Sequence, residues 1–510
     1  MSVGGTLREA FDYPFSRLDP FGSHIDPPSV AVYETLVVKG PDSKPHPGLA
    51  KAWSVAPDGR AWTFELRPGL HFHSGASLDA HAVVAALDRL RWGFYDQRQS
   101  WYWDAVDRVE AVSDMALRIQ LHQPYENLPS LLWGTHTAIF NEALRAADHE
   151  AFGSRLADGT GPFRLRSWSP EKVVAERWDR YPGIPASFLD SRGPALIDSV
   201  EWVSLPSEGD RLEALERGEV HVLHGPVPVE VERLENDHRF TVVRHGQGSN
   251  FYLGLNWSRD DLSFDDLHVR RALSLAIDRD QLVSAAVAGH GRATWGPLPP
   301  WDPYYEPAVD ASRKVERHRA QALLDQAGWK RAGGGIRERA GNRFEFECVV
   351  QDDDVHLRVA KDLQLQLREI GVSLKPRPVR PFKDFYSACE ASPASFINKW
   401  LWQDGMDATI GFNASWCRPF PNAQQATVAE LDEAFREWVR AAGQPALARA
   451  AGHAQRVFAD QLPSIPLLAP DDIWVIDRRV RGYRPYPATL YPFYHSTRID
   501  GQAAGRAAKG

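Results

Sequence analysis

The first half of the chain shows a strand-like alternation of apolar and polar residues followed by helix-like spacing. In residues 61–73, apolar residues occupy every second position up to Pro68, and the alternation resumes after Gly69. A period of two is typical of a strand with one buried face, and a proline–glycine pair is typical of a turn. This segment predicts a hairpin, and Ser77 behind it is predicted to cap a helix whose buried face includes Val83 and Leu87. Further strands are predicted at 101–123 and 159–168.

The second half of the chain has longer helical periods between short apolar strands. Residues 251–256 predict a strand, and Asp265 and Asp278 are predicted to cap the next two helices, the second of which ends at Gly289. Strand, helix and strand then follow with the spacing of a right-handed βαβ unit, at 344–350, 355–370 and 372–379. This half is therefore expected to be α/β, with further helices at 316–327, 431–439 and 445–462 and a strand at 473–476.

Length and composition narrow the class of protein. The 510 residues are about three times the ~150 residues of one domain, so two or three domains are expected. With 43% apolar and 25% charged residues, the chain is predicted to be globular, and its apolar runs are too short to span a membrane. The net charge of −8 is spread along the chain, which disfavours a nucleic-acid partner. Eighteen tryptophans beside three methionines favour a ligand with flat faces.

The cysteines disfavour several kinds of site. The three cysteines stand far apart in the sequence and form no CxxC pair, so a zinc knuckle, a thioredoxin-type site and a disulfide scaffold are not expected, and at most one bridge can form. They are Cys348, Cys389 and Cys417.

Seven segments in fixed order resemble a known family. They are AWSVAPDGRAWTFELRPGLHFHSGASLDAHAVVAALDRL, DGTGPFRLRSW, ALERGEVHVL, NFYLGLN, VRRALSLAIDRDQLVSAAVAG, AQALLDQAGW and DQLPSIPLL. Each one alone is a weak signal, but their order and spacing cover nearly the whole chain. In these segments the sequence resembles the family 5 extracytoplasmic solute-binding proteins of ABC importers, which include oligopeptide, dipeptide and nickel receptors.

The resemblance implies an α/β fold of two lobes with a hinge, the periplasmic-binding-protein fold, plus a small extra domain on the first lobe. Lobe I would comprise residues 1–40, 161–254 and 477–510, the extra domain 41–160, and lobe II 255–476. The glycine- and proline-rich start of the predicted strand at 159–168 places a boundary near residue 160 independently. Crossings close to Gly254 and Ile476 would serve as the hinge.

The resemblance also implies a function. The chain is expected to capture a small solute, to deliver it to the permease subunits of a membrane transporter, and to act as a monomer without cofactor, metal or nucleic acid. The first residues lack the basic start and apolar segment of a secretory signal. A cytoplasmic protein and a mature form without its leader both fit this start, and the resemblance favours a mature periplasmic protein.

The expected solute site centres on the segment WLWQDGMD, residues 400–407. The family has a Trp here, two residues, Asp, two residues and Asp-Pro; this chain keeps the spacing of the Asp residues but shifts the Trp and lacks the Pro. In peptide-binding members the first Asp pairs with the α-ammonium of the ligand, and Asp404 is the matching residue. Asp404 and Asp407 are alternatively caps of a helix or turn around Gly405. Trp400 and Trp402 share one face if they lie on a strand, either as core or as a stacking platform.

Further aromatic and basic residues are weaker candidates for contact with the solute. Trp416 lies in a loop-like run, and Arg418 two residues later is suited to holding an anion. The extra domain adds an aromatic and basic run that the resemblance places near the solute: Arg89, Tyr95, Trp101 and Trp103. His71 and His73 have the spacing of metal ligands on one strand face, but no further ligand accompanies them, so a metal site is not expected.

The identity of the solute stays open between two classes. Peptides are the common cargo of the family, whereas the aromatic excess and the shifted Trp also suit an oligosaccharide or a sugar–amino-acid conjugate; nickel chelates fit less well. A hydrolase using Asp404 and Asp407 would be an alternative of another class, but no GxSxG, HExxH, GxxxxGK(S/T) or GxGxxG motif supports an enzyme. A ligand-sensing regulator on the same fold would need a DNA-binding domain, for which residues 1–40 are too short.

Overall fold

The computed structural model divides the chain into two compact units. The first comprises Met1–His245 and Asp472–Gly510, and the second Gly246–Asp471. The sequence placed the corresponding crossings later, near Gly254 and Ile476; the whole strand before Gly254 belongs to the sheet of the second unit, and the strand ending near Ile476 belongs to that of the first. The structure describes residues 4–20, 27–42, 44–93, 103, 105–134, 137–186, 188, 193–246, 249–300, 302–310, 314–380, 382–391, 395–401, 405–418, 422–485 and 494–501.

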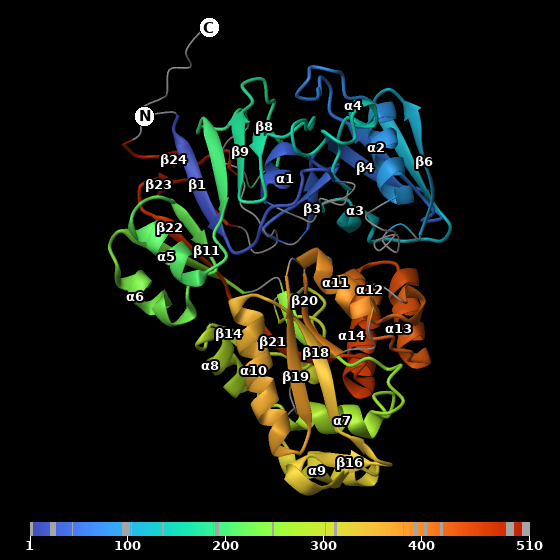
Figure 1. Ribbon diagram of the computed structural model, residues 1–510. Coiled ribbons are helices and arrows are strands. Elements are labelled where there is room, and N and C mark those ends of the chain that lie inside the picture. Colours follow the sequence, from blue (N-terminus) through green and yellow to red (C-terminus); the bar gives the residue numbers. More distant parts are fainter. Residues whose placement is uncertain are drawn as a thin grey trace. The chain divides into compact units, whose positions relative to one another are not determined.

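The first unit is built on a seven-stranded sheet (Figure 1). In spatial order its strands are β12 (Phe240–His245), β22 (Asp472–Asp477), β11 (Val222–His224), β1 (Thr6–Phe11), β10 (Ser199–Ser204), β9 (Lys172–Arg177) and β8 (Phe163–Trp168). β1 runs parallel to both β10 and β11, and the other pairs are antiparallel. Helices α5 (Glu208–Glu216) and α6 (Val231–Asn236) bury Leu215 and Leu234 against Leu223 and Val475 of this sheet. The strand predicted at 159–168 is confirmed as β8.

A second, four-stranded sheet of the first unit consists of β4 (Ala50–Val55), β5 (Ala61–Leu66), β7 (Ala116–Leu121) and β6 (Val106–Ser113). Trp62, Phe64 and Leu66 are buried as the alternation predicts. The predicted hairpin within 61–73 is wrong, because β5 pairs with β4 and β7 instead. Helix α2 (Ala80–Gly93) packs on β6 and β7, and its cap is Asp79 rather than Ser77, since Asp79 Oδ1 accepts from the Ala82 amide at 2.9 Å. The assignment of 41–160 as a separate extra domain stays a prediction.

Short elements complete the first unit. They are α1 (Pro27–Val32), β2 (Val37–Lys39), β3 (Pro45–Pro47), α3 (Leu128–Leu131), α4 (Glu142–Ala147), β23 (Val480–Arg481) and β24 (Arg498–Ile499). Close backbone approach ties α1 to the chain entering β8. A Cβ atom on Gly159 would lie 2.1 Å from the carbonyl oxygen of Val32, so only glycine fits there.

The second unit is built on a six-stranded sheet and contains the predicted βαβ unit. Its strands in spatial order are β14 (Gly291–Ala293), β21 (Ile465–Pro470), β13 (Ser249–Gly254), β20 (Ser395–Leu401), β18 (Glu345–Gln351) and β19 (Ser373–Val379). β18 and β19 are parallel and joined by α10 (Asp354–Glu369), which confirms the prediction. Asp353 caps α10 by accepting from the His356 amide at 2.9 Å. The α/β class expected from the sequence is thus confirmed in both units.

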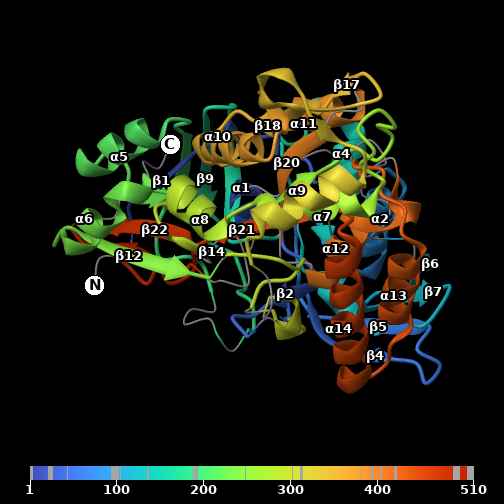
Figure 2. The same ribbon diagram turned by 90° about the horizontal axis from the view of Figure 1, so that it is seen from below.

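Helix caps in this unit agree with the sequence at one position and differ at another. Asp278 caps α8 (Arg279–Val287) as predicted, accepting from the Gln281 amide at 3.0 Å. The cap of α7 (Leu267–Ala276) is Asp266 instead of Asp265. The three other predicted helices are confirmed with shifted ends as α9 (Arg317–Gln326), α13 (Ala429–Arg440) and α14 (Gln444–Gln461), beside α11 (Phe382–Ala391), α12 (Gly405–Asn413) and the small sheet of β15 (Lys330–Arg331), β16 (Arg337–Arg339) and β17 (Asn342–Arg343). α13 and α14 pack side by side (Figure 2).

Buried arginines fasten the core of the second unit. The guanidinium of Arg279 lies 3.6 Å from the ring centre of Trp295, and its Nε donates to the carbonyls of Thr294 and Pro466, both at 2.9 Å. Arg270 likewise donates to backbone carbonyls. A buried guanidinium needs all its donors satisfied, so these residues join helices, loops and β21 into one packed unit.

Two further findings concern the whole of the described chain. Among its helices, none combines the length and the apolar character required to cross a membrane. The three cysteines, Cys348, Cys389 and Cys417, are buried and are not joined in a disulfide.

Candidate functional site

Most of the predicted solute-contacting residues lie where β20 leads into α12 and a short 3₁₀ turn, η8 (Ser415–Cys417). β20 pairs with β13 in the register Trp400 opposite Asn250, so Trp400 lies on a strand. Trp402 and Asp404 lie outside the described residues, as does the side chain of Trp400. Their contact with a solute stays a prediction.

Asp407 is turned inward in the first turn of α12. Its side chain belongs to a residue only 5% exposed, and Oδ1 accepts from the indole Nε1 of Trp438 on α13 at 3.3 Å. Trp438 is 1% exposed and meets the ring of Tyr304 edge-on at 5.0 Å. A carboxylate in the first turn also suits the positive end of the helix dipole. The geometry therefore gives Asp407 an internal partner on a neighbouring helix.

The 3₁₀ turn η8 is held on the same helix. The amide of Ser415 donates to Asp432 Oδ1 at 2.9 Å, and the Ser415 hydroxyl donates to Asp432 Oδ2. Trp416 is 40% exposed; its ring lies edge-on to Phe435, and the guanidinium of Arg436 lies 4.9 Å from its ring centre. An exposed indole held by an aromatic ring and a cation is a rigid surface on which a flat group can stack.

Arg418 ends the described part of this segment. It is exposed, and its Nε donates to the carbonyl of Ser415 at 3.1 Å. That Arg418 holds an anion of the solute stays a prediction.

Buried amides shape the loop around these residues, and the sequence analysis did not single them out. Asn413 Oδ1 accepts from Gln424 Nε2 at 3.1 Å and from the Ser464 hydroxyl at 3.0 Å. Asn422 Nδ2 donates to the carbonyls of Ala414 and Ala426. The signal in the sequence is the run of amide residues between Asn413 and Gln425, because buried amides that satisfy backbone groups are typical of loops with one fixed conformation.

The predicted residues of the first unit are only partly described. Tyr95 and Trp101 lie outside the described residues. Trp103 is buried, and Arg89 on α2 is half-buried with its Nε 4.0 Å from Glu142 Oε1. The structure therefore places Arg89 beside an acidic partner, and the contact of these four residues with a solute stays a prediction.

The histidine pair does not form a metal site. His71 is exposed, whereas His73 is buried and donates from Nε2 to the Gly161 carbonyl at 2.9 Å; burial lowers the pKa of His73 to about 4. Within the ranges that the structure describes, no group of three or more His, Cys, Asp or Glu side chains is placed to hold a metal ion.

A buried polar cluster in the first unit lies near the carboxyl ends of the parallel strands β1 and β11, the edge at which ligands bind in open α/β sheets. Glu9 on β1 is 1% exposed, and its Oε2 accepts from the Tyr494 hydroxyl at 2.8 Å. That hydroxyl accepts from Trp202 Nε1 at 3.0 Å. Burial raises the pKa of Glu9 to about 7, because desolvation outweighs its hydrogen bonds. A carboxyl group that titrates near neutral pH is therefore enclosed in this sheet.

A histidine–aspartate pair lies beside this cluster. His224, at the end of β11, has Nε2 2.6 Å from Asp472 Oδ1, at the residue where the chain enters the first unit. The His224 ring also lies 4.9 Å from that of Trp474 and 5.8 Å from that of Phe11. The sequence signal for the neighbouring cluster is Glu9 itself, a charged residue at the alternating position between the apolar Leu7 and Phe11.

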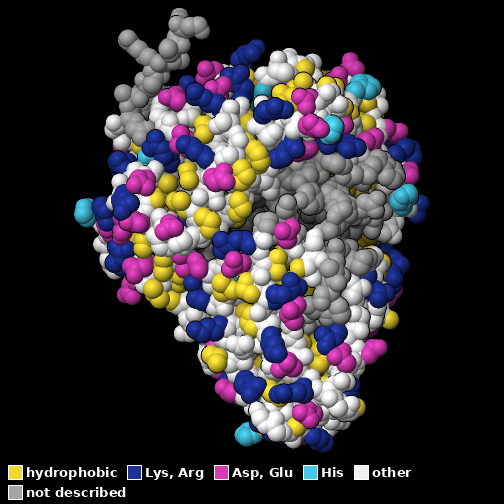
Figure 3. Space-filling view, in the orientation of Figure 1, with side chains coloured by type: hydrophobic (Ala, Val, Ile, Leu, Met, Phe, Trp, Pro, Cys, Tyr) yellow, Lys and Arg dark blue, Asp and Glu magenta, His cyan; other side chains and the backbone are white. Residues whose placement is uncertain are grey.

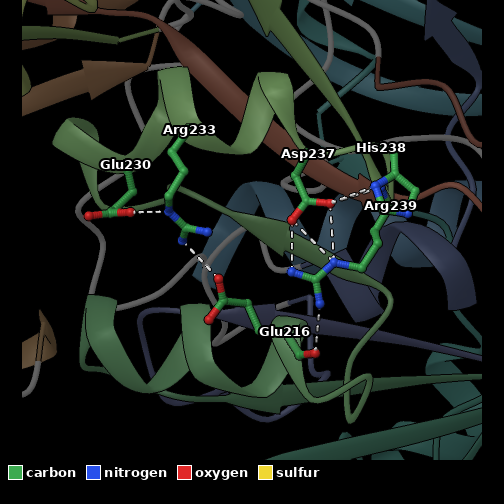
Figure 4. Close-up of polar contacts among 6 residues, drawn as sticks. All are labelled: Glu216, Glu230, Arg233, Asp237, His238 and Arg239. Atoms are coloured by element: carbon green, nitrogen blue, oxygen red, sulfur yellow. Dashed lines mark hydrogen bonds and ion pairs between the residues drawn. The ribbon is translucent and has the colours of Figure 1, made fainter.

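The densest group of charged contacts is elsewhere on the first unit, where α5 and α6 meet (Figure 4). Arg233 Nη2 lies 2.8 Å from Glu216, and its Nε lies 2.5 Å from Glu230. Arg239 forms a two-pronged pair with Asp237 and holds the pKa of that carboxyl down to about 2. Positive and negative side chains are likewise interspersed over the face shown in Figure 3. These ion pairs join the two helices. Because the charges neutralise one another, the group is a poor candidate for a solute site.

Comparisons with known proteins agree with this fold. The sequence model described as "Bacterial extracellular solute-binding proteins, family 5 Middle" matches residues 44–419. The glutathione-binding protein GsiB of Pectobacterium atrosepticum is 28% identical over 384 residues, which are 71% of this chain and 66% of that protein. A probable di/tripeptide-binding protein of Pseudomonas aeruginosa is 25% identical over 472 residues, 86% of this chain and 85% of the other. The structure of the oligopeptide-binding protein AppA from Bacillus subtilis in complex with a nonapeptide superimposes with a TM-score of 0.84 at 20% identity, covering 96% of this chain and 97% of that one.

Proposed function

This chain belongs to the bacterial extracellular solute-binding proteins of family 5, and we propose that it captures a peptide or peptide-like solute and delivers it to the permease subunits of an ABC importer. The observation that carries the proposal is the family match over residues 44–419, joined by relatives named for binding glutathione and di- or tripeptides. The family assignment makes the chain a transport receptor rather than a hydrolase or a regulator. We further propose that it acts in the periplasm, as a monomer and without nucleic acid.

The proposed binding step is closure of the two units on the solute. It is supported by the chain passing twice between the units, after His245 and before Asp472, because two short crossings allow rotation through a few backbone dihedrals. Scattering in solution should show a smaller radius of gyration when a solute that binds is added. An unchanged radius with a proven ligand would contradict closure.

The proposed solute contacts are those expected from the sequence, except Asp407, whose carboxylate accepts from Trp438. They are Asp404, Trp402, Trp400, Trp416 and Arg418 in the second unit, and Arg89, Tyr95, Trp101 and Trp103 in the first. The exposed ring of Trp416 beside Arg418 supports a surface that accepts a flat or anionic group. Asp404 is proposed to pair with the ammonium group of a peptide.

Calorimetric titration tests the solute class. After unfolding and refolding to remove any solute that co-purifies, the protein is titrated with reduced glutathione, trialanine, a tetrapeptide, a maltooligosaccharide and a sugar–amino-acid conjugate. Binding of the peptides supports the proposal. Binding of the oligosaccharide or the conjugate alone would overturn the peptide class while keeping the receptor role.

Two substitutions then separate the classes at the level of residues. For a peptide, Asp404→Asn removes the partner of a charged group and should weaken binding by about 2 to 5 kcal/mol. For a neutral sugar the same change costs one hydrogen bond, about 0.5 to 1.5 kcal/mol, and Trp402→Ala should cost more because it removes a stacking face. Thermal melts of both variants control for misfolding. If both variants bind as the wild type does, this segment does not contact the solute.

A further inference from the structure

We propose that Asp407 and Asp432 are positioning residues, which hold the segment from Gly405 to Arg418 on helix α13 and so set the place of the side chains that meet the solute. The inference rests on the proposed function, since it concerns the same site. It assigns to Asp407 a role through Trp438, in place of the direct solute contact that its sequence position suggests.

The two carboxylates form reciprocal bonds between the segment and the helix. Asp407 lies on the segment and accepts from Trp438 of α13 at 3.3 Å. Asp432 lies on α13 and accepts from the amide of Ser415 of the segment at 2.9 Å and from its hydroxyl. One bond therefore holds the start of α12, and the other pair holds η8 at the far end of the segment.

The spacing of these bonds fixes orientation as well as position. Asp432 and Trp438 are six residues apart on one helix, which corresponds to about 9 Å along its axis. Between them Phe435 contacts the ring of Trp416. Two attachments at this separation prevent the segment from rotating about either one, and the intervening ring contact fixes the indole itself.

Burial makes both carboxylates dependent on their hydrogen-bond partners within the protein. Asp407 and Asp432 are both buried, so each carboxylate depends on the hydrogen bonds it accepts inside the protein. Replacing Asp432 would leave the partly buried amide of Ser415 without its acceptor. The helix in turn is fixed to α14, where Glu437 Oε2 lies 2.7 Å from His453 Nδ1.

Loss of these bonds should affect solute binding, because a binding site tolerates only small displacements of its contacting groups. Contacting groups need to be held within about 0.5 Å of their productive places. The segment carries Trp416 and Arg418 and follows directly on Trp402 and Asp404. Loosening it from α13 should therefore weaken binding although neither carboxylate touches the solute.

Variants at position 407 distinguish positioning from direct contact. Asp407→Asn keeps an oxygen that accepts from the Trp438 indole but removes the charge, whereas Asp407→Leu removes both. Trp438→Phe keeps a buried ring but removes the donor. If Asp407 positions the segment, Asp407→Leu and Trp438→Phe should each weaken binding of the tightest peptide of the panel about tenfold, and Asp407→Asn should stay within about threefold of the wild type. The double variant that combines Asp407→Leu with Trp438→Phe should bind the peptide no more weakly than either single variant, because both changes remove the same hydrogen bond.

Two control variants separate positioning from general stability. Leu447→Ala shortens a buried side chain on α14 and leaves the bonds of Asp407 and Asp432 in place, so it should lower the melting temperature without changing affinity at temperatures where the protein is folded. Arg440→Gln alters the exposed end of α13, where Arg440 pairs with the exposed Glu433, and should leave both the melting temperature and the affinity unchanged. All titrations are made where circular dichroism shows each variant folded.

Hydrogen–deuterium exchange gives a readout that needs no solute. Amides of residues 405–418 should exchange faster in Asp407→Leu, Trp438→Phe and Asp432→Ala than in the wild type, and at the wild-type rate in Asp407→Asn. Unchanged exchange in the first three variants would overturn the positioning role. So would Asp407→Asn binding as weakly as Asp407→Leu, which would show that the charge itself meets the solute. If the wild-type protein binds no peptide of the panel but the variants exchange as expected, the proposed peptide class is refuted. The positioning role is then still supported.

Discussion

The replacement of Glu9 by glutamine should stabilise the protein increasingly as the pH rises. Glu9 is buried on β1 with one oxygen bonded to the Tyr494 hydroxyl. Its Oε1 accepts no hydrogen bond from the described part of the chain, and burial raises its pKa to about 7. Because the folded state holds the proton more tightly than the unfolded chain, whose carboxyl has a pKa of 4.5, the stabilising contribution is complete below pH 4.5. It is lost as the pH rises to about 7 and stays lost above.

The size of the effect follows from the shift in pKa. A rise from 4.5 to about 7 corresponds to roughly 3 kcal/mol between the fully protonated and fully ionised states. Glutamine is neutral at every pH and has nearly the same shape. The difference in the free energy of unfolding between Glu9→Gln and the wild type should therefore grow with pH. It should be about 2 to 3 kcal/mol larger at pH 8 than at pH 5.

Urea unfolding of both proteins at pH 5, 6, 7 and 8 measures this difference directly. Buried histidines also make the stability depend on pH in this range, because the pKa values of His73, His221 and His495 are lowered from 6.5 to about 4 and only the unfolded chain takes up their protons here; this contribution is common to both proteins. Glu219→Gln, on the exposed surface of the same unit, serves as the control for replacing one carboxylate by an amide. A difference for Glu9→Gln that is the same at pH 5 and pH 8 would refute the raised pKa and its cause.

Two other predictions concern the packing of each unit. Arg279→Met should destabilise the second unit by about 3 to 5 kcal/mol in thermal or urea unfolding, because the carbonyls of Thr294 and Pro466 lose buried donors. Arg279→Lys should recover only part of this stability, since an ammonium lacks the planar fork of a guanidinium. Full stability of Arg279→Met would contradict the role of Arg279. Gly159→Ala should destabilise the first unit by more than about 3 kcal/mol, because its Cβ would lie 2.1 Å from the Val32 carbonyl oxygen. Gly193→Ala, which has open space around its Cβ position, should be tolerated. Equal melting temperatures of the two variants would contradict the close approach at Gly159.

Local patterns in the sequence were sufficient for elements whose cause is local. The β18–α10–β19 unit and the cap at Asp278 depend on hydrophobic period and on a side chain that bonds an amide three residues away. The family was also evident from ordered segments, because a profile of residue types needs no knowledge of contacts. The same local reasoning misplaced caps by a residue or two at Asp265 and Ser77, since neighbouring polar residues have similar capping ability.

Pairing and side-chain direction were decided only in the tertiary structure. The alternation of Trp62, Phe64 and Leu66 showed that β5 has a buried face, but the partners of β5 are β4 and β7, which a period of two does not specify. The spacing of Asp404 and Asp407 suggested one shared role, yet Asp407 bonds the indole of Trp438 on another helix. The Glu9 carboxyl meets a tyrosine 485 positions away in the chain. A sequence pattern reports which side chains avoid water, whereas the partner of each buried polar group depends on which distant segments the packed core brings within hydrogen-bonding distance.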